Sequence, residues 1–165
     1  MERTIEGFHR DDLGDWVAEL SCLHNQHVRH HPPFQERAWV LDESQRVARI
    51  GAELDCPLCD RAELPEGLRL ARTAGPFDGD TLPFALRAAH LVAERTWGCL
   101  RVQEGSVLFS MESEPPVRVR VEAGGRQPIP PGVRHALTVE GPVRLTVDFL
   151  VPVPTDPTGP STCRR

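Results

Sequence analysis

The stretch ELSCLHNQHVRHHPP, which runs from Glu19 to Pro33, contains four histidines and one cysteine. Imidazole is the commonest side-chain ligand for metals, so this density indicates a metal site. A structural zinc site needs four nitrogen or sulfur ligands, and this stretch offers a single thiol. Two further thiols follow in the segment LDCPLCD, where Cys56 and Cys59 form a C-x-x-C pair. We therefore interpret the two segments as halves of one site.

A C-x-x-C pair is typical of either a redox dithiol or half of a zinc site. The redox type follows a strand and opens a helix, as in thioredoxin-like domains. Here the preceding segment ESQRVARIGAE, residues 43–53, has helical spacing, with Val47 and Ile50 on one face and Gly51 as the expected C-cap. A helix before the pair favours zinc, and Cys22 then provides the third thiolate.

The fourth ligand is either His24 or His27. The segment DWVAELSC, residues 15–22, alternates like a strand, and QHVRHH, residues 26–31, is its expected hairpin partner. His24 then lies in the hairpin loop beside Cys22, as in a zinc knuckle, and we favour it over His27 on the returning arm. His30 and His31 are expected to be solvated. The competing interpretation is two unrelated sites with reduced thiols.

The composition is that of a soluble globular protein. The chain has 165 residues, 39% hydrophobic and 26% charged, and an odd number of cysteines, five. Reduced or metal-bound thiols are typical of a reducing compartment. The N-terminal segment is charged throughout, unlike a signal peptide. No apolar run approaches the length of a membrane span. We therefore expect a cytoplasmic protein with no membrane association.

The charge distribution argues against one class of partner, nucleic acids. The net charge is −5, and residues 1–63 carry 7 arginines against 13 acidic side chains. A module that binds nucleic acid needs a basic face for the phosphates. No nucleic-acid partner is therefore expected.

The pattern of elements predicts a mainly β protein in two modules. Residues 1–62 form a small α+β module stapled by zinc, because a core below about 70 residues seldom suffices alone. Residues 63–152 contain short β-rich runs between turn residues, which predict an antiparallel sandwich or small barrel. The one helix considered there is PFALRAAHLVAE, residues 83–94. Residues 153–165 are rich in Pro and Thr and are expected to be a disordered tail.

A second histidine pair lies in the β-rich module. His135 is the last residue of the turn segment IPPGVRH, and His90 precedes Trp97 by seven residues. Two histidines and a carboxylate, here Glu94, can hold a divalent metal and leave coordination positions open. The alternative is a pair of hydrogen-bonded histidines without metal. In either case both rings are expected to point into one pocket, with Trp97 forming part of its wall.

Two resemblances support this division. Residues 7–60 resemble an uncharacterised bacterial domain family of the form GFHxDxxGDWVAxLxCGHxQHxRHxPP…LDCxLCD. This implies a zinc-type fold without a defined activity. The family's glycine between the Cys and His ligands is Leu23 here. A glycine at that position would provide a positive φ, which would strain a leucine.

The second module is similar to the cupins of YeaR-type proteins and of the N-terminus of TehB-type tellurite-resistance proteins. The segments that carry this similarity are LPEGL, TWGCLRVQEGSV, IPPGVRHAL and GPVRLTVDFL, within residues 64–151. The resemblance implies a double-stranded β-helix, or jelly roll, whose site contains His90 and His135. One departure is Ala93, where the family often has a basic residue.

Three functions follow from these expectations. The first is a two-module binding protein: a structural zinc at Cys22, His24, Cys56 and Cys59, and a cupin that binds a divalent metal, a small anion or a metalloid in a stress or tellurite-type response. The second is a metal-dependent cupin enzyme resembling an oxygenase. The third is an adaptor whose zinc module recruits a partner. Cupins of this size often pair, so a homodimer is possible.

Overall fold

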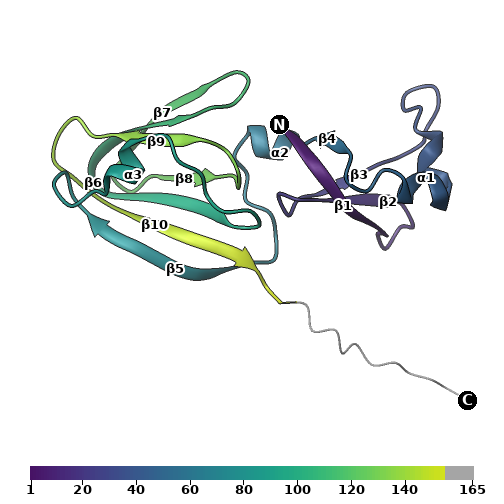
Figure 1. Cartoon of the computed structure of the whole chain (residues 1–165), viewed down its shortest axis with the longest axis horizontal. Helices are drawn as coiled ribbons and strands as arrows, with labels where there is room; N and C mark the ends of the chain where they lie inside the picture. Colours follow the sequence, from purple (N-terminus) through teal and green to yellow (C-terminus); the bar gives the residue numbers. More distant parts are fainter. Residues whose placement is uncertain (155–165) are drawn as a thin grey trace, which may run out of the picture.

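Two antiparallel β-sheets that follow one another in the sequence make up the fold (Figure 1). The computed structural model describes residues 1–154, so the expected disordered tail lies almost wholly outside the described residues. The mainly β class is confirmed. The two sheets lie on either side of the boundary proposed after residue 62, which itself remains a prediction. No helix within residues 1–154 is long and apolar enough to cross a membrane.

The first sheet has the strand order β3-β2-β1-β4. Its strands are β1 (Glu2–Arg10), β2 (Trp16–Leu20), β3 (Asn25–His27) and β4 (Glu53–Asp55). The expected hairpin is confirmed, because β2 pairs with β3 in register Val17 to His27. Strands β1 and β4 were not expected, since both are rich in charged residues that face solvent.

Three short helical elements complete this module: a 3-10 helix η1 (Ala38–Leu41), α1 (Glu43–Val47) and α2 (Pro57–Asp60). The expected helix within residues 43–53 is present as α1 but ends early. Its N-cap Asp42 accepts a hydrogen bond from the Gln45 amide at 3.0 Å. Gly51 has a φ of 88° and turns the chain into β4 rather than capping the helix.

The second sheet has the order β5-β10-β6-β7, and β8 and β9 also pair with β6. Its strands are β5 (Leu68–Phe77), β6 (Trp97–Met111), β7 (Val117–Glu122), β8 (Arg126–Ile129), β9 (His135–Thr138) and β10 (Val143–Pro152). The expected helix within residues 83–94 shrinks to α3 (Phe84–Arg87). These strands surround one core that includes Leu100, Phe109 and Leu145.

Strand β6 organises this sheet because its two halves have different partners. Residues 97–105 pair with β10, and residues 106–111 pair with β7. Gly105 lies at the change of partner with a φ of 73°, and a Cβ there would lie 2.0 Å from the Pro142 carbonyl oxygen. Glycine therefore lets one continuous strand cross between the two pairings, where the sequence suggested two separate strands.

Candidate functional site

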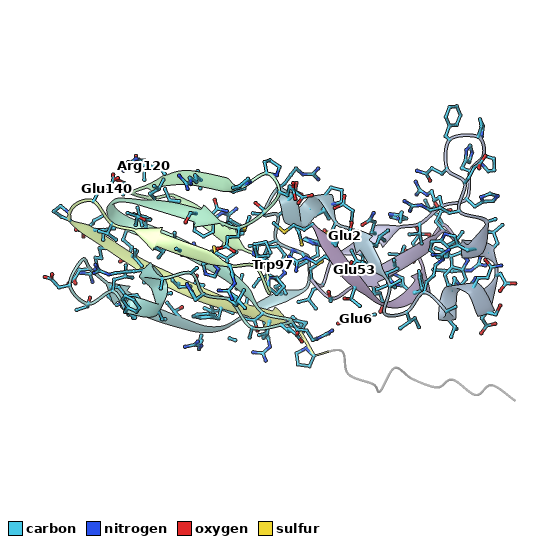
Figure 2. All side chains as sticks on the ribbon, turned by 45° about the horizontal axis from the view of Figure 1, so that its top comes forward. Glu2, Glu6, Glu53, Trp97, Arg120 and Glu140 are labelled. Atoms are coloured by element: carbon cyan, nitrogen blue, oxygen red, sulfur yellow. The ribbon has the colours of Figure 1, made fainter. Side chains whose placement is uncertain are left out.

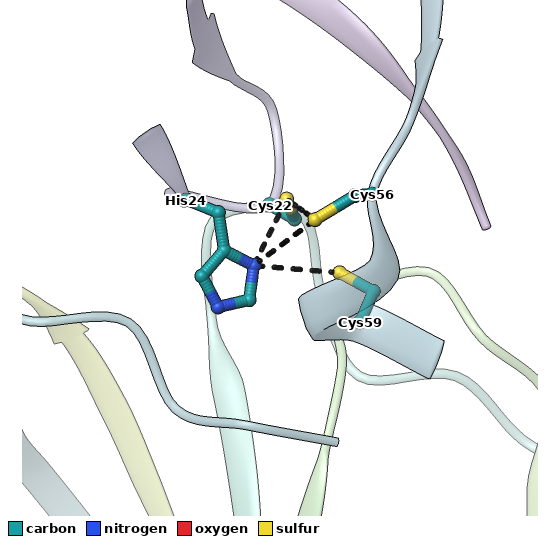
Figure 3. A group of neighbouring side chains, drawn as sticks. All are labelled: Cys22, His24, Cys56 and Cys59. Carbon is teal, nitrogen blue, oxygen red and sulfur yellow. Dashed lines mark hydrogen bonds between the residues drawn. The ribbon is translucent and has the colours of Figure 1, made fainter. Parts of the chain in front are cut away.

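Four ligand side chains meet between the β2–β3 loop and α2: Cys22, His24, Cys56 and Cys59 (Figure 3). Their ligand atoms all lie within 4.8 Å of one another, and all four residues are buried. His24 Nδ1 is 3.5, 3.4 and 3.6 Å from the sulfurs of Cys22, Cys56 and Cys59. The Cys22 and Cys56 sulfurs are 3.8 Å apart, well beyond a disulfide bond.

These separations are those of a tetrahedral zinc site. With Zn–S bonds of about 2.3 Å and Zn–N bonds of about 2.05 Å, tetrahedral angles place two sulfurs about 3.8 Å apart and a sulfur and nitrogen about 3.5 Å apart. The cluster could therefore hold a metal such as zinc without rearrangement.

The local backbone aims these side chains at one point. The loop after β2 is closed by the Leu23 amide, which donates to the Leu20 carbonyl at 2.7 Å. Leu23 has a φ of 72°, the left-handed conformation that glycine adopts without strain. On the other side Cys56 directly follows β4 as the N-cap of α2, and Pro57 starts this helix, which holds Cys59.

The thiols favour a cation at their centre. Contacts with Cys22 and Cys59 hold the pKa of Cys56 far below its usual range, whereas Cys22, Cys56 and burial raise the pKa of Cys59. One thiolate therefore suppresses the ionisation of its neighbour. Burial acts to lower the pKa of His24, but hydrogen bonds with Cys22 and Cys56 outweigh burial and raise it to about 9. A divalent cation bound among the sulfurs would allow neighbouring thiols to be ionised together.

The other histidines of the N-terminal module lie away from the cluster. His27 Nε2 is 2.9 Å from Asp11 Oδ2, and its side chain is half exposed. His30 Nδ1 accepts a hydrogen bond from the Arg37 amide. His31 is exposed in the following turn. Of the two candidates for the fourth ligand, the structure thus places His24 in the cluster and His27 outside it.

Trp97 covers the cluster from the side of the second sheet (Figure 2). Its indole N–H donates to the Cys22 carbonyl at 2.8 Å, and its ring meets that of His24 edge-on at 5.4 Å. The expectation that Trp97 forms a wall of the His90–His135 pocket is therefore wrong. Side chains alternate along a strand, and because Gly98 and Leu100 face the barrel interior, Trp97 faces the opposite way.

The His24 ring is also fixed from behind, because Nε2 donates to the Glu63 carbonyl at 3.1 Å. This leaves Nδ1 free to face the thiols, the arrangement that orients a metal-bound histidine. Because all four side chains are buried and four ligands satisfy a tetrahedral zinc, the cluster has the character of a structural site.

The structure brings the second pair, His90 and His135, together. Each backbone N–H donates to the other's carbonyl, at 3.1 and 3.0 Å, and the ring centroids are 4.0 Å apart. Each Nδ1–H donates to a backbone carbonyl, that of Ala88 or Val133. Both Nε2 atoms therefore keep a lone pair that can accept a proton or bind a metal.

His135 is neutral at physiological pH. Burial lowers its pKa to about 4, and the charge of His90 acts in the same direction. A neutral imidazole at His135 offers no positive charge to an anion.

No third ligand joins the pair within the described part of the chain, where the Cys and His cluster forms the one group of three or more ligands. Glu94, the proposed carboxylate, is exposed and lines a groove with Arg3 and Pro131.

A cavity of about 640 Å³ adjoins His135 at the ends of β6, β7 and β9. Ser110, Arg118 and Arg134 line it together with His135. Neither arginine was predicted as a site residue from the sequence, where Arg118 lies in the run VRVRVE and Arg134 in the segment IPPGVRH.

Comparisons with known proteins match two parts of the chain to domain families. Residues 6–63 match a protein family of unknown function, DUF3565, and residues 72–147 match the TehB-like domain. The chain thus joins an N-terminal DUF3565 domain to a TehB-like domain, and both expected resemblances are confirmed. No curated protein matches the chain in sequence.

Two solved structures resemble the second module. One is an Escherichia coli K12 protein solved as a structural-genomics target, with 20% identity and a TM-score of 0.51, covering 56% of this chain and 98% of that one. The other is TehB from Haemophilus influenzae, with 18% identity and a TM-score of 0.48, covering 53% of this chain and 32% of that one. This chain thus spans about a third of TehB. The first likeness establishes the fold alone.

Proposed function

We propose that this is a two-module metal-binding protein of the cytoplasm, whose N-terminal module is folded around one structural zinc. The ligands are Cys22, His24, Cys56 and Cys59. The observation that carries the proposal is the match between their sulfur and nitrogen separations and a tetrahedral zinc site. A module of this size needs a structural metal or a similar cross-link, because its own hydrophobic core is small.

In the TehB-like domain, we propose that His90 and His135 bind a divalent metal through their Nε2 atoms. Neutral imidazoles with occupied Nδ1–H groups suit a cation better than an anion. A small anion or metalloid would then complete the coordination, in line with a role in a stress or tellurite-type response. The cavity beside His135, with Arg118 and Arg134, offers space and positive charge for such a ligand.

The test of the zinc site is elemental analysis of the purified protein. The wild type should contain one zinc per chain, and Cys56→Ser should lose it. Cys99→Ala is the matched control, since Cys99 is also buried but lies outside the cluster. Wild-type protein without zinc, or zinc retained by Cys56→Ser, would refute the proposed site.

The histidine pair is tested separately, by titrating Co²⁺ into protein whose first site is already filled with zinc. Absorbance of bound Co²⁺ should appear in the wild type and vanish in His135→Gln and His90→Gln. His27→Gln, at an exposed histidine, should behave like the wild type. No Co²⁺ signal in the wild type would leave the pair as hydrogen-bonded groups.

A further inference from the structure

Trp97 belongs to the second module but is buried in the core of the first. Its side chain is 0% exposed and packs in the hydrophobic cluster that contains Cys22, Cys56 and Cys59. Leu150 of β10 lies directly opposite Trp97 in the sheet, on the same face, and packs against the same cluster. One end of the second sheet therefore forms a wall of the first module's core.

Trp97 contacts two of the four candidate zinc ligands. Its indole N–H donates to the Cys22 carbonyl at 2.8 Å, which gives this buried donor the partner that it needs. Its ring meets the His24 ring edge-on, with the centroids 5.4 Å apart. Groups outside the ligand set that hold the ligands in place contribute to metal affinity. Part of what orients the ligands of the first module thus comes from the second.

The acceptor of the Trp97 hydrogen bond lies in a loop whose shape depends on the ligands. The Leu23 amide donates to the Leu20 carbonyl at 2.7 Å, the Leu20 amide donates to the His24 carbonyl at 3.0 Å, and Leu23 has a φ of 72°. A bound metal would fix Cys22 and His24 on either side of Leu23 and hold it in this unfavourable conformation. Loss of the metal would free the loop, and with it the Cys22 carbonyl.

Other polar contacts between the modules lie outside the cluster. Arg3 donates to the Pro131 carbonyl at 2.9 Å, and Arg95 forms an ion pair with Glu6. None of these four residues is a candidate ligand. Trp97 is therefore the contact through which the state of the cluster would reach the second module.

We propose that the zinc site is a metal-dependent joint between the two modules. Zinc fixes the surface onto which Trp97 docks, and docking of Trp97 tightens the binding of zinc. The inference rests on the proposed zinc site at Cys22, His24, Cys56 and Cys59. The two effects are reciprocal, because an interaction that raises zinc affinity on docking must raise docking affinity on zinc binding by the same factor. Zinc occupancy then controls how firmly the TehB-like domain is held.

The first experiment measures zinc affinity in the full chain by competition with a chromophoric chelator. Trp97→Phe keeps an aromatic ring but loses the N–H donor, and it should weaken zinc binding about 10-fold. Trp97→Ala also loses the ring and should weaken it up to about 100-fold. Trp39→Phe is the matched control, because Trp39 packs against the same core but contacts Phe8 and Arg49 and should bind zinc like the wild type.

The second experiment follows the indole N–H of Trp97 by NMR in the wild type, with the signal assigned from its absence in Trp97→Phe. In the zinc-loaded protein this proton should exchange slowly with solvent, because it is buried and bonded to the Cys22 carbonyl. After chelation of the zinc it should exchange rapidly, and re-addition of zinc should restore its protection.

Wild-type zinc affinity in both Trp97 variants would overturn the joint while leaving the zinc site intact. A Trp97 indole proton that stays protected after zinc removal would also overturn it, since docking would then not depend on the metal. If Trp97→Ala does not fold, Trp97→Phe decides alone. Co²⁺ bound to Trp97→Phe should keep the absorption of tetrahedral thiolate coordination, because Trp97 is not a ligand, and loss of that absorption would count against the joint. A wild type that binds no zinc would refute both proposals.

Discussion

Leu23 lies between two of the candidate metal ligands, Cys22 and His24. Its φ of 72° belongs to a conformation that costs a residue with a Cβ about 1–2 kcal/mol. The side chain packs partly against the surrounding core, which offsets some of this cost. The strained residue is held between two metal ligands, so zinc binding would contribute to keeping it there.

Leu23→Gly and Leu23→Ala separate conformation from packing, because both remove the leucine side chain. At an ordinary helix or strand position, glycine is less stable than alanine by roughly 0.5–1 kcal/mol. At a φ of 72° we expect the reverse, with Leu23→Gly more stable by about 1 kcal/mol. Urea unfolding of the zinc-loaded variants measures this difference. A more stable Leu23→Ala would show that the loop avoids the left-handed conformation.

His135 predicts a pH dependence of stability. Its folded pKa of about 4 lies below the ordinary value of 6.5, so between these values the unfolded chain binds more protons than the folded one. Stability therefore falls as the pH drops from about 6.5 to about 4, by at most about 1.4 kcal/mol per pH unit. Below about pH 4 this contribution no longer changes.

The measurement is urea unfolding at several pH values, for the wild type and for His135→Gln. The variant should lose this part of the slope, while other acid-sensitive groups, the zinc site included, contribute equally to both proteins. His27→Gln serves as the control, since its side chain is half exposed. Parallel curves for wild type and His135→Gln would contradict the neutral, buried state of this histidine.

Among the elements, β6 depends most on a single glycine. Gly105→Ala would place a Cβ against the Pro142 carbonyl at a positive φ, so we expect destabilisation by about 3 kcal/mol or more. Gly124 also has a positive φ, 82°, but open space around its Cβ position, so Gly124→Ala should cost about 1 kcal/mol. Thermal unfolding of both variants measures the difference. Equal costs would mean that the backbone at Gly105 relaxes away from Pro142.

The sequence located the elements whose signals are local. The β2–β3 hairpin follows from alternation, and the ligands Cys22, Cys56 and Cys59 follow from spacing. Strands β1 and β4 were not predicted from the sequence, because their charged side chains face solvent and because they pair with each other across a long stretch of sequence. The face of the sheet on which the Trp97 side chain lies was also not predicted. Trp97 starts a strand, and the neighbour that covers it decides which face is buried.

The molecule has two hydrophobic cores, which differ in the groups that stabilise them. The core of the second sheet is built from apolar residues of β6, β8, β9 and β10 and needs no metal. The core of the first module contains three of the candidate zinc ligands themselves, together with Trp97 from β6. Stability is therefore expected to be uneven, with the first module dependent on zinc and the second independent of it.

Zinc removal from the intact chain tests this division by hydrogen exchange. After chelation we expect the amides of β1 and β2 to exchange rapidly, because the cluster that holds their core loses its cation. The amides of β10 and of the second half of β6 should stay protected, since their core contains none of the ligands. The start of β6 should show intermediate exchange, because Trp97 loses its hydrogen bond to Cys22 while its backbone remains paired with β10. Re-addition of zinc should restore the original pattern. Simultaneous loss of protection in both sheets would instead show that the chain unfolds as one cooperative unit, with the contacts of Trp97 transmitting the loss of metal to the second sheet.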